Sequence, residues 1–482
     1  MHLPNSSMTP APELLISCHC GTAKQTVRLR DHSSNKPQDI NLCHCAACRH
    51  NTGLMCVSYA GIERPDSIQG LREYQSTTKT ISRFFCATCG SHVFWKLQSP
   101  LVDKHYVQGS DGPLAITEQK EWWAVATGVI IEEESSEGYN SEKLMKYAKH
   151  INTTGTGDGG LSPFIRNIGD LQGLKAIHDQ DLPPPSTHHP AEEKFGSADR
   201  DVDINIFSHR DDDERVEGEV LKAFCHCRTV QFQITRPNAT SKLPRSNYPD
   251  LMVPYHTSSP QIQNPKDNKW WLRPRPSDHS IETKTVEQGQ LTRYLAGTCA
   301  CRSCRLTSGF EIQTWAFIPR SNIFFRIHES QRGALASGSW RPLSQNESDE
   351  GVDIVPLDFT TLPPSILTSY ESSQGVRREF CSQCGATVFW RDRWRPELID
   401  VSIGLLDAAE GVRAESWLDW WTERVSFAED AGNGRTGQTA ERAKSLIDTL
   451  EEGLRNYHGQ GRKGSWSEDP QEFGFLEREG LP

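Results

Sequence analysis

The segments FCATCGSHVFW, residues 85–95, and FCSQCGATVFW, residues 380–390, contain the same arrangement of cysteine, glycine and aromatic residues. Each segment ends a longer series, in which a CxC pair comes first, a CxCxxC group follows, and the CxxC pair of the quoted segment closes the series. Fourteen of the 15 cysteines belong to this series, which occurs twice in the same order. Random placement would not produce this order twice, so the sequence predicts two copies of one module.

The residues that flank the middle CxCxxC group repeat as well. An arginine follows its third cysteine directly, and a glycine comes four residues later. These positions are Cys43, Cys45, Cys48, Arg49 and Gly53 in the first copy, and Cys299, Cys301, Cys304, Arg305 and Gly309 in the second. The remaining cysteine, Cys56, aligns with Ile312 in a predicted strand, and we expect a buried thiol there rather than a metal ligand.

Composition excludes several classes of protein. The chain has 482 residues, with 52 basic and 63 acidic side chains and a formal charge of −11, which is the wrong sign for a protein that grips phosphate backbones. No nucleic-acid partner is therefore expected. No apolar run approaches the roughly 20 residues that span a bilayer, and no signal peptide is recognised. We expect a cytoplasmic protein, with the nucleus as a further possibility.

The spacing of the two copies predicts the domain organisation. We expect a first zinc domain at 12–171, a Pro-rich acidic linker at 172–215, a second zinc domain at 216–430 and a helical or disordered tail at 431–482. The second copy carries insertions, with 71 residues between Cys227 and Cys299 where the first has 22 between Cys20 and Cys43. The first insertion contains Trp270 and Trp271, which we expect to anchor it, and a protein partner through the inserted loops is possible.

The modules themselves are predicted to be mainly β. Short runs that are rich in β-branched and aromatic residues and bounded by turn residues include TVQFQIT, EIQTWAFIP and LIDVSIGLL, and no βαβ alternation is present. In the tail, Ala440, Leu446, Ile447, Leu450 and Leu454 are spaced as on one face of a helix, which begins near a threonine that can cap it.

Seven cysteines per module divide into four plus three. Zinc prefers four nitrogen or sulfur ligands in tetrahedral geometry, and two short knuckles supply four thiolates. The outer pairs would form closed sites from Cys18, Cys20, Cys86 and Cys89, and from Cys225, Cys227, Cys381 and Cys384. The CxCxxC groups would then hold a metal with one open position for water or substrate. His44 and His50 align with Ala300 and Leu306, so neither is a ligand that both modules share.

Other interpretations of the cysteines remain open at this point. An iron–sulfur cluster could use the CxCxxC group, although the four-cysteine set has zinc-knuckle spacing. All the metals could also be structural, with the three-cysteine site closed by an undetected ligand. A disulfide framework is disfavoured by the compartment and by the odd count of seven cysteines per module.

These motifs resemble the glutathione-dependent formaldehyde-activating enzyme family, which includes the centromere protein V type domain (GFA/CENP-V). The resemblance implies two tandem Mss4-like (β-tent) domains, each with a structural zinc on its outer cysteines and a second zinc on its middle three, four zinc ions per chain. It also implies a carbon–sulfur lyase that joins glutathione, as co-substrate, to formaldehyde or runs the reaction backwards. Arg49 and Arg305 would be candidates to contact a glutathione carboxylate or to support the thiolate charge.

Two departures from the family pattern make the second domain the weaker candidate for catalysis. Arg228 stands where the first copy has Gly21, and the middle motif reads CACRSC rather than CHCxxC. His19 and His226, which both copies share, are expected to shape the knuckle rather than to act as bases. The alternative function is a non-catalytic zinc-stabilised protein that uses the tandem modules to bind another macromolecule.

Overall fold

The structure is a computed structural model that describes residues 11–30, 36–76, 80–99, 120–134, 144–168, 176–177, 219–255, 262–274, 292–328, 331 and 351–457. The predicted linker therefore lies outside the described residues, except for Ala176 and Ile177. These two residues form a short strand that pairs with the first half of the chain. Within the described part, no helix has the length and apolar character that a membrane span requires.

Three sheets form the first half of the chain. A five-stranded sheet has the order β4-β8-β7-β6-β5, and two three-stranded sheets have the orders β2-β1-β9 and β11-β10-β3. The strands are β1 (Glu13–Ile16), β2 (Gln25–Arg28), β3 (Gln38–Cys43), β4 (Tyr59–Ile62), β5 (Leu71–Gln75), β6 (Ile81–Cys86), β7 (His92–Ser99), β8 (Lys120–Ala126), β9 (Ile130–Glu134), β10 (Met145–Ile151) and β11 (Ala176–Ile177). Helix α1 (Ala46–Thr52) and the 3-10 turns η1 (Thr127–Val129) and η2 (Thr154–Thr156) connect them.

Two larger sheets form the second half. One has the order β18-β17-β13-β12-β23, and the eight-stranded sheet has the order β14-β15-β16-β22-β21-β20-β19, with β24 paired to β15. The strands are β12 (Val220–Phe224), β13 (Gln231–Thr235), β14 (Leu272–Pro274), β15 (Thr292–Cys299), β16 (Gln313–Pro319), β17 (Ile323–His328), β18 (Val352–Pro356), β19 (Leu367–Ser373), β20 (Val376–Cys381), β21 (Thr387–Asp392), β22 (Leu398–Ser402), β23 (Leu406–Asp407) and β24 (Leu418–Trp420). The helical elements are α3 (Arg302–Ser308), η4 (Ala239–Lys242), η8 (Arg320–Asn322), η9 (Ile403–Leu405), η10 (Ala428–Asp430) and α5 (Gly437–Arg455).

The mainly β prediction is confirmed. The run TVQFQIT contains β13 and EIQTWAFIP contains β16. The run LIDVSIGLL begins as β22 and continues as η9 from Ile403, where the chain contacts α1 of the first half. The inserted tryptophans are anchored as predicted, since Trp270 and Trp271 are buried and their indole N–H groups donate to backbone carbonyls.

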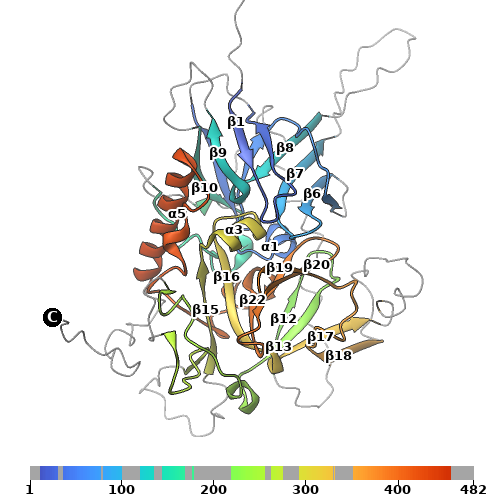
Figure 1. The fold of residues 1–482 in the computed structure, drawn as a ribbon, viewed down its shortest axis with the longest axis vertical. Coiled ribbons are helices and arrows are strands. Elements are labelled where there is room, and N and C mark those ends of the chain that lie inside the picture. Colours follow the sequence, from blue (N-terminus) through green and yellow to red (C-terminus); the bar gives the residue numbers. More distant parts are fainter. Residues whose placement is uncertain are drawn as a thin grey trace, which may run out of the picture.

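The two halves meet through contacts that occur in equivalent pairs. Helix α1 packs against η9 of the second half, and α3 packs against η1 of the first half, so both short helices lie in the middle of the molecule (Figure 1). The backbone N–H of Gly128 donates to the carbonyl of Gly309 at 2.9 Å, and that of Gly404 donates to Gly53 at 3.2 Å. The duplicated modules are thus arranged like the two subunits of a twofold dimer within one chain.

The predicted tail helix is α5, and it packs on the first half of the chain. Leu446, Ile447, Leu450 and Leu454 are buried in the same apolar core that runs through both halves. Figure 1 shows α5 along β9 and β10, and its closest contacts are with β9. The expected threonine cap is not made. The helix begins at Gly437, so Thr439 lies inside it and its hydroxyl donates to Glu133 at 2.6 Å, and the N-cap residue, Thr436, forms no side-chain cap hydrogen bond.

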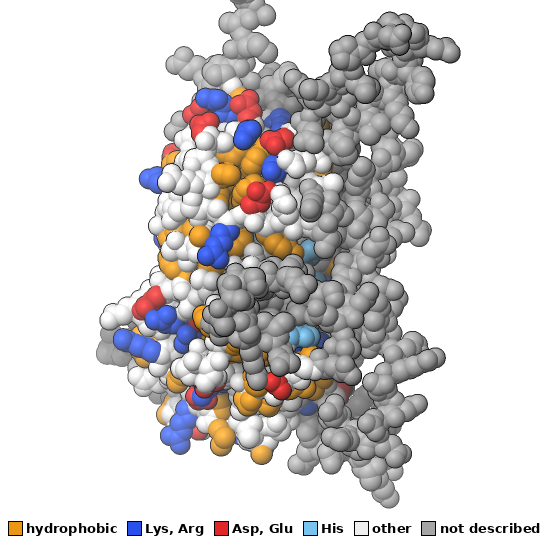
Figure 2. Space-filling model, turned by 90° about the vertical axis from the view of Figure 1, so that its right-hand side faces the viewer, with side chains coloured by type: hydrophobic (Ala, Val, Ile, Leu, Met, Phe, Trp, Pro, Cys, Tyr) orange, Lys and Arg blue, Asp and Glu red, His pale blue; other side chains and the backbone are white. Residues whose placement is uncertain are grey.

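The described surface is mixed in charge. On the face that Figure 2 shows, acidic and basic side chains alternate around small hydrophobic patches.

Candidate metal centres

The structure brings the outer cysteines together in two groups of four. The sulfur atoms of Cys18, Cys20, Cys86 and Cys89 all lie within 4.8 Å of one another, as do those of Cys225, Cys227, Cys381 and Cys384. The Sγ–Sγ distances are 3.4 Å for Cys20 and Cys86 and 3.5 Å for Cys227 and Cys381. Four sulfurs around one zinc ion, at about 2.3 Å each, would be about 3.8 Å apart, so the donor sets fit tetrahedral zinc.

The middle cysteines form two groups of three at the starts of α1 and α3. Cys45 and Cys301 are the N-cap residues of these helices, and their sulfurs accept from the backbone N–H groups of Cys48 and Cys304. This cap places the second and third cysteines of each motif on one turn, and the preceding strand ends at the first cysteine. The sulfurs of each group lie within 4.8 Å of one another. All 15 cysteines are free of disulfides.

Among the described residues, no fourth histidine, cysteine or carboxylate donor joins either three-thiol group. His44 is buried and its ring bonds to His150 at 2.9 Å. His50 bonds to the carbonyl of Phe224 in the other half at 2.8 Å. Cys56 is buried as predicted, but it lies just before β4 rather than in a strand. The described residues thus give each group three thiols and no fourth donor of these kinds, and the open metal position stays a prediction.

A buried arginine accompanies each three-thiol group, and our sequence reasoning missed it. Arg83 donates to Cys48 Sγ at 3.5 Å, and Arg378 donates to Cys304 Sγ at 3.4 Å. Hydrogen bonds from the neighbouring thiols, and then the charge of Arg378, hold the pKa of Cys304 well below its usual range. The signal was present in the sequence, because both arginines stand three residues before the first cysteine of the CxxC pair.

Arg49 and Arg305 lie between the two halves. Arg49 donates to the carbonyl of Gly404 at 3.3 Å, and Arg305 donates to that of Gly128 at 2.6 Å. Both side chains are buried, and burial lowers their pKa values to about 10 and about 9. Each guanidinium therefore has a partner in the opposite half, and contact with glutathione stays a prediction that this placement does not favour.

His19 and His226 also reach across to the opposite half. The ring of His19 bonds to the Tyr370 hydroxyl at 2.8 Å, and that of His226 bonds to the Tyr74 hydroxyl at 2.6 Å. Burial lowers the pKa of both imidazoles to about 4, so they are neutral at neutral pH. These contacts agree with the predicted structural role. They also join the two halves, which the spacing of the motifs did not indicate.

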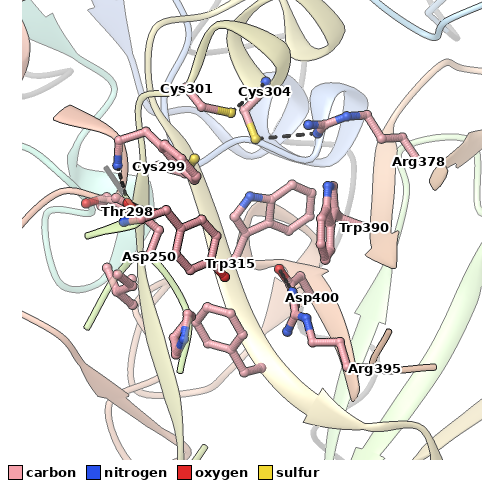
Figure 3. A pocket seen from close by; sticks show the side chains of 17 residues that line it. Asp250, Thr298, Cys299, Cys301, Cys304, Trp315, Arg378, Trp390, Arg395 and Asp400 are labelled. Carbon is pink, nitrogen blue, oxygen red and sulfur yellow. Dashed lines mark hydrogen bonds and ion pairs between the residues drawn. The ribbon is translucent and has the colours of Figure 1, made fainter. Parts of the chain in front are cut away.

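A cavity of about 140 Å³ adjoins the three-thiol group of the second half. Figure 3 shows Cys299, Cys301 and Cys304 at one end, the indole rings of Trp315 and Trp390 next to them, and Asp400 with Arg395 at the opposite end. Burial raises the pKa of Asp400 to about 6, although the Arg395 guanidinium, 2.9 Å away, opposes this shift. The second half thus contains a cavity that is lined by candidate metal ligands and by a carboxyl whose pKa is raised to about 6.

The comparison with family models supports the repeat. Residues 13–124 and 358–424 match the model described as glutathione-dependent formaldehyde-activating enzyme. The predicted resemblance is confirmed, and the two matched segments are consistent with two tandem copies of a domain of this family. The second match includes Cys381 and Cys384. The equivalent hydrogen bonds between the halves extend the correspondence to the part of the second half that precedes this match. Comparisons with curated proteins and with solved structures give no match.

Proposed function

We propose that the protein is a zinc-dependent carbon–sulfur lyase of the glutathione-dependent formaldehyde-activating type, which forms or cleaves a small thiol adduct such as S-hydroxymethylglutathione. The observation that carries this proposal is the pair of three-thiol groups, which no fourth histidine, cysteine or carboxylate donor joins within the described ranges, and one of which adjoins a cavity. A closed structural site would need neither the vacant position nor the adjoining space.

The reaction is an addition of a thiol to an aldehyde. The sulfur forms a bond to the carbonyl carbon, the carbon–oxygen π bond opens, and the thiol proton passes to the oxygen. The reverse reaction restores the thiol and the aldehyde. A zinc ion held by Cys299, Cys301 and Cys304 would supply an exchangeable position and Lewis acidity at this place.

The chain's own residues have separate roles in this proposal. Arg378 donates to Cys304 Sγ and so offsets part of the thiolate charge. Trp315 packs against Cys299 and Cys304 and keeps water from that side of the group. Asp400, whose pKa burial raises to about 6, lies with Arg395 at the end of the cavity opposite the thiols and bounds the space there.

Magnetisation-exchange NMR of glutathione with formaldehyde tests the proposal. We expect the zinc-loaded protein to accelerate exchange, and the Cys45→Ala, Cys301→Ala double variant to lose the acceleration. Each single variant then reports which half is active. Cys56→Ala is the matched control, because it removes a buried thiol that belongs to neither group.

Native mass spectrometry of the same samples checks the metal sites. We expect four zinc ions in the protein and in the control, with two of the four harder to remove. Only two ions at every zinc concentration would contradict the open sites. If four ions bind and exchange is not accelerated, formaldehyde activation is excluded, and another thiol adduct or the non-catalytic binding protein becomes the better hypothesis.

A further inference from the structure

The wall of the cavity is one row of side chains across four strands. Phe317 on β16, Asp400 on β22, Trp390 on β21 and Arg378 on β20 are direct cross-strand partners in turn. Cross-strand partners point to the same face of a sheet. Trp315, two residues before Phe317 on β16, lies on the same face.

The equivalent row of the first half has smaller residues. Its partners are Gly61 on β4, Ala124 on β8, Trp95 on β7 and Arg83 on β6. The tryptophan and the arginine are thus common to both halves, whereas Phe317 and Asp400 replace a glycine and an alanine. The second half has an aromatic ring and a carboxyl group that the first half lacks at these positions.

The insertion of the second half closes another side of the cavity. Asp250, from this insertion, accepts from the Ser426 hydroxyl at 3.0 Å and from the backbone N–H of Phe427 at 2.7 Å. Phe427 has a φ of 54°, a left-handed conformation that is costly for a bulky residue. The ring of Tyr255, also from the insertion, packs edge-on against it, with centroids 5.8 Å apart. Asp250 thus stabilises Phe427 in a strained backbone conformation, which indicates that this wall of the cavity is a specific feature of the structure.

The first half again differs at the equivalent position. Ile151 pairs with Cys43 as Ser426 pairs with Cys299, so Asn152 corresponds to Phe427. Asn152 also has a left-handed φ, 57°, and its amide donates to Cys43 Sγ at 3.4 Å. A polar contact to the thiol in one half is replaced by an aromatic wall in the other.

The size and lining of the cavity define what can enter it. Five aromatic side chains line it: Tyr255, Trp315, Phe317, Trp390 and Phe427. Its volume of about 140 Å³ is close to that of an apolar cavity of about 150 Å³ that takes up benzene. Its two arginines are already paired, Arg378 with Cys304 and Arg395 with Asp400. Asp250 and Asp400 are paired as well, so this lining favours an uncharged, apolar group about the size of one ring.

We propose that this cavity is the substituent pocket of the second half, and that it binds a thiol adduct whose carbon group is an aromatic ring rather than a single carbon. The proposal rests on the lyase function proposed above. The sulfur of the adduct lies toward Cys299, Cys301 and Cys304, the ring lies between Trp315 and Trp390, and the charged ends of glutathione remain outside.

Two stable thioethers, S-benzylglutathione and S-methylglutathione, test the pocket without turnover. Isothermal titration calorimetry of each with the zinc-loaded, full-length protein compares the ring with a single carbon. We expect the benzyl compound to bind at least tenfold more tightly, because only its ring fills the apolar cavity.

Two variants locate the binding site. Trp315→Ala removes a wall and should reduce benzyl binding at least tenfold. Phe427→Asn installs the residue of the first half, which accepts the left-handed backbone readily and so preserves folding; it should also weaken benzyl binding and leave methyl binding unchanged. Trp394→Ala is the control, because this tryptophan is exposed and does not line the cavity.

The outcomes separate this inference from the proposed function. Equal binding of the two thioethers, or benzyl binding that both variants retain, would overturn the aromatic pocket, even if formaldehyde exchange proves to be accelerated. Tight benzyl binding that the variants abolish would support the pocket even if no exchange is found. With benzaldehyde in place of formaldehyde, faster exchange that Cys301→Ala abolishes and Cys45→Ala retains would support both proposals.

Discussion

At the scale of single residues, Arg228 shows how the second half keeps a turn that glycine makes in the first. Gly21 and Arg228 each follow a CxC pair and have left-handed φ values of 83° and 61°. The Arg228 guanidinium lies 3.4 Å from the centre of the Phe224 ring, and the ring of His50 from the first half also stacks on Phe224. The departure from the family pattern therefore changes a contact between the halves and leaves the metal ligands in place.

Substitution of Arg228 should separate backbone strain from the ring contact. Arg228→Gly and Arg228→Ala both remove the cation–π contact, but only alanine retains the left-handed strain. We expect the glycine variant to be more stable than the alanine variant by about 1 kcal/mol. Urea unfolding at saturating zinc measures this difference, and equal stabilities would show that the turn is not strained.

The raised pKa of Asp400 predicts a pH dependence of stability. The native carboxyl has a pKa of about 6, above the value near 3.9 in an unfolded chain, so the native state binds a proton more tightly. The contribution of this group to stability is therefore full below about pH 4 and is lost as pH rises through 6, by on the order of 3 kcal/mol.

Asp400→Asn provides the comparison, because asparagine does not titrate. Arg395, Asp392 and the Cys304 thiol face Asp400 in both proteins. The difference in unfolding free energy between the variant and the original protein should change between pH 4 and 6 in favour of asparagine. A difference that is constant with pH would mean that Asp400 is ionised throughout.

At the scale of elements, the short helices α1 and α3 each have two structural roles. Each presents three thiols from its N-terminal turn and docks its C-terminal end on the opposite half. The C-caps Gly53 and Gly309 have left-handed φ values of 78° and 88°. A Cβ at Gly53 would lie 2.1 Å from the carbonyl oxygen of Thr387, and one at Gly309 would lie 2.3 Å from that of His92.

Alanine at either cap glycine should destabilise the protein. The left-handed backbone costs about 1–2 kcal/mol for a residue with a Cβ, and the clash with the opposite backbone adds to this cost. We expect Gly53→Ala and Gly309→Ala to lower the thermal unfolding midpoint by several degrees at fixed zinc concentration. Gly155→Ala is the control, because nothing lies within 4 Å of its added Cβ. An unchanged midpoint in both cap variants would contradict the docking of these helices.

At the scale of the whole molecule, the two halves and the last helix form one unit. Buried Arg435 donates to Glu311 of the second half at 2.9 Å and to the Thr127 carbonyl of the first half at 2.9 Å. The Thr127 hydroxyl donates to the same Glu311 at 2.8 Å. A paired charge that is buried this deeply is costly to expose, so these contacts hold the halves together.

The halves should therefore stay together without a continuous chain. A protease site inserted between residues 178 and 218 allows the zinc-loaded protein to be cut between β11 and β12. We expect the fragments to elute as one species in size-exclusion chromatography, because α5 of one fragment packs on β9 of the other. The uncut protein is the control, and separate elution at micromolar concentration would show that the linker is required.

The sequence by itself determined the repeat, the mainly β fold and the grouping of the cysteines. Metal ligands must lie a few ångströms apart, so their spacing is visible in short motifs. The buried face of α5 was predicted from the helical spacing of Leu446, Ile447, Leu450 and Leu454. These features depend on local geometry, which a short segment specifies.

Only the tertiary structure decided how the modules use these features. Arg49, Arg305, His19 and His226 stand beside ligands in the sequence but contact the opposite half, which no local pattern can indicate. Likewise, Phe317 comes from β16, which is distant in sequence from the consecutive strands of Arg378, Trp390 and Asp400, and strand register aligns the four side chains. The cavity beside Cys304 depends on that register and on an insertion folded over it, because space between side chains is a property of packing rather than of any one segment.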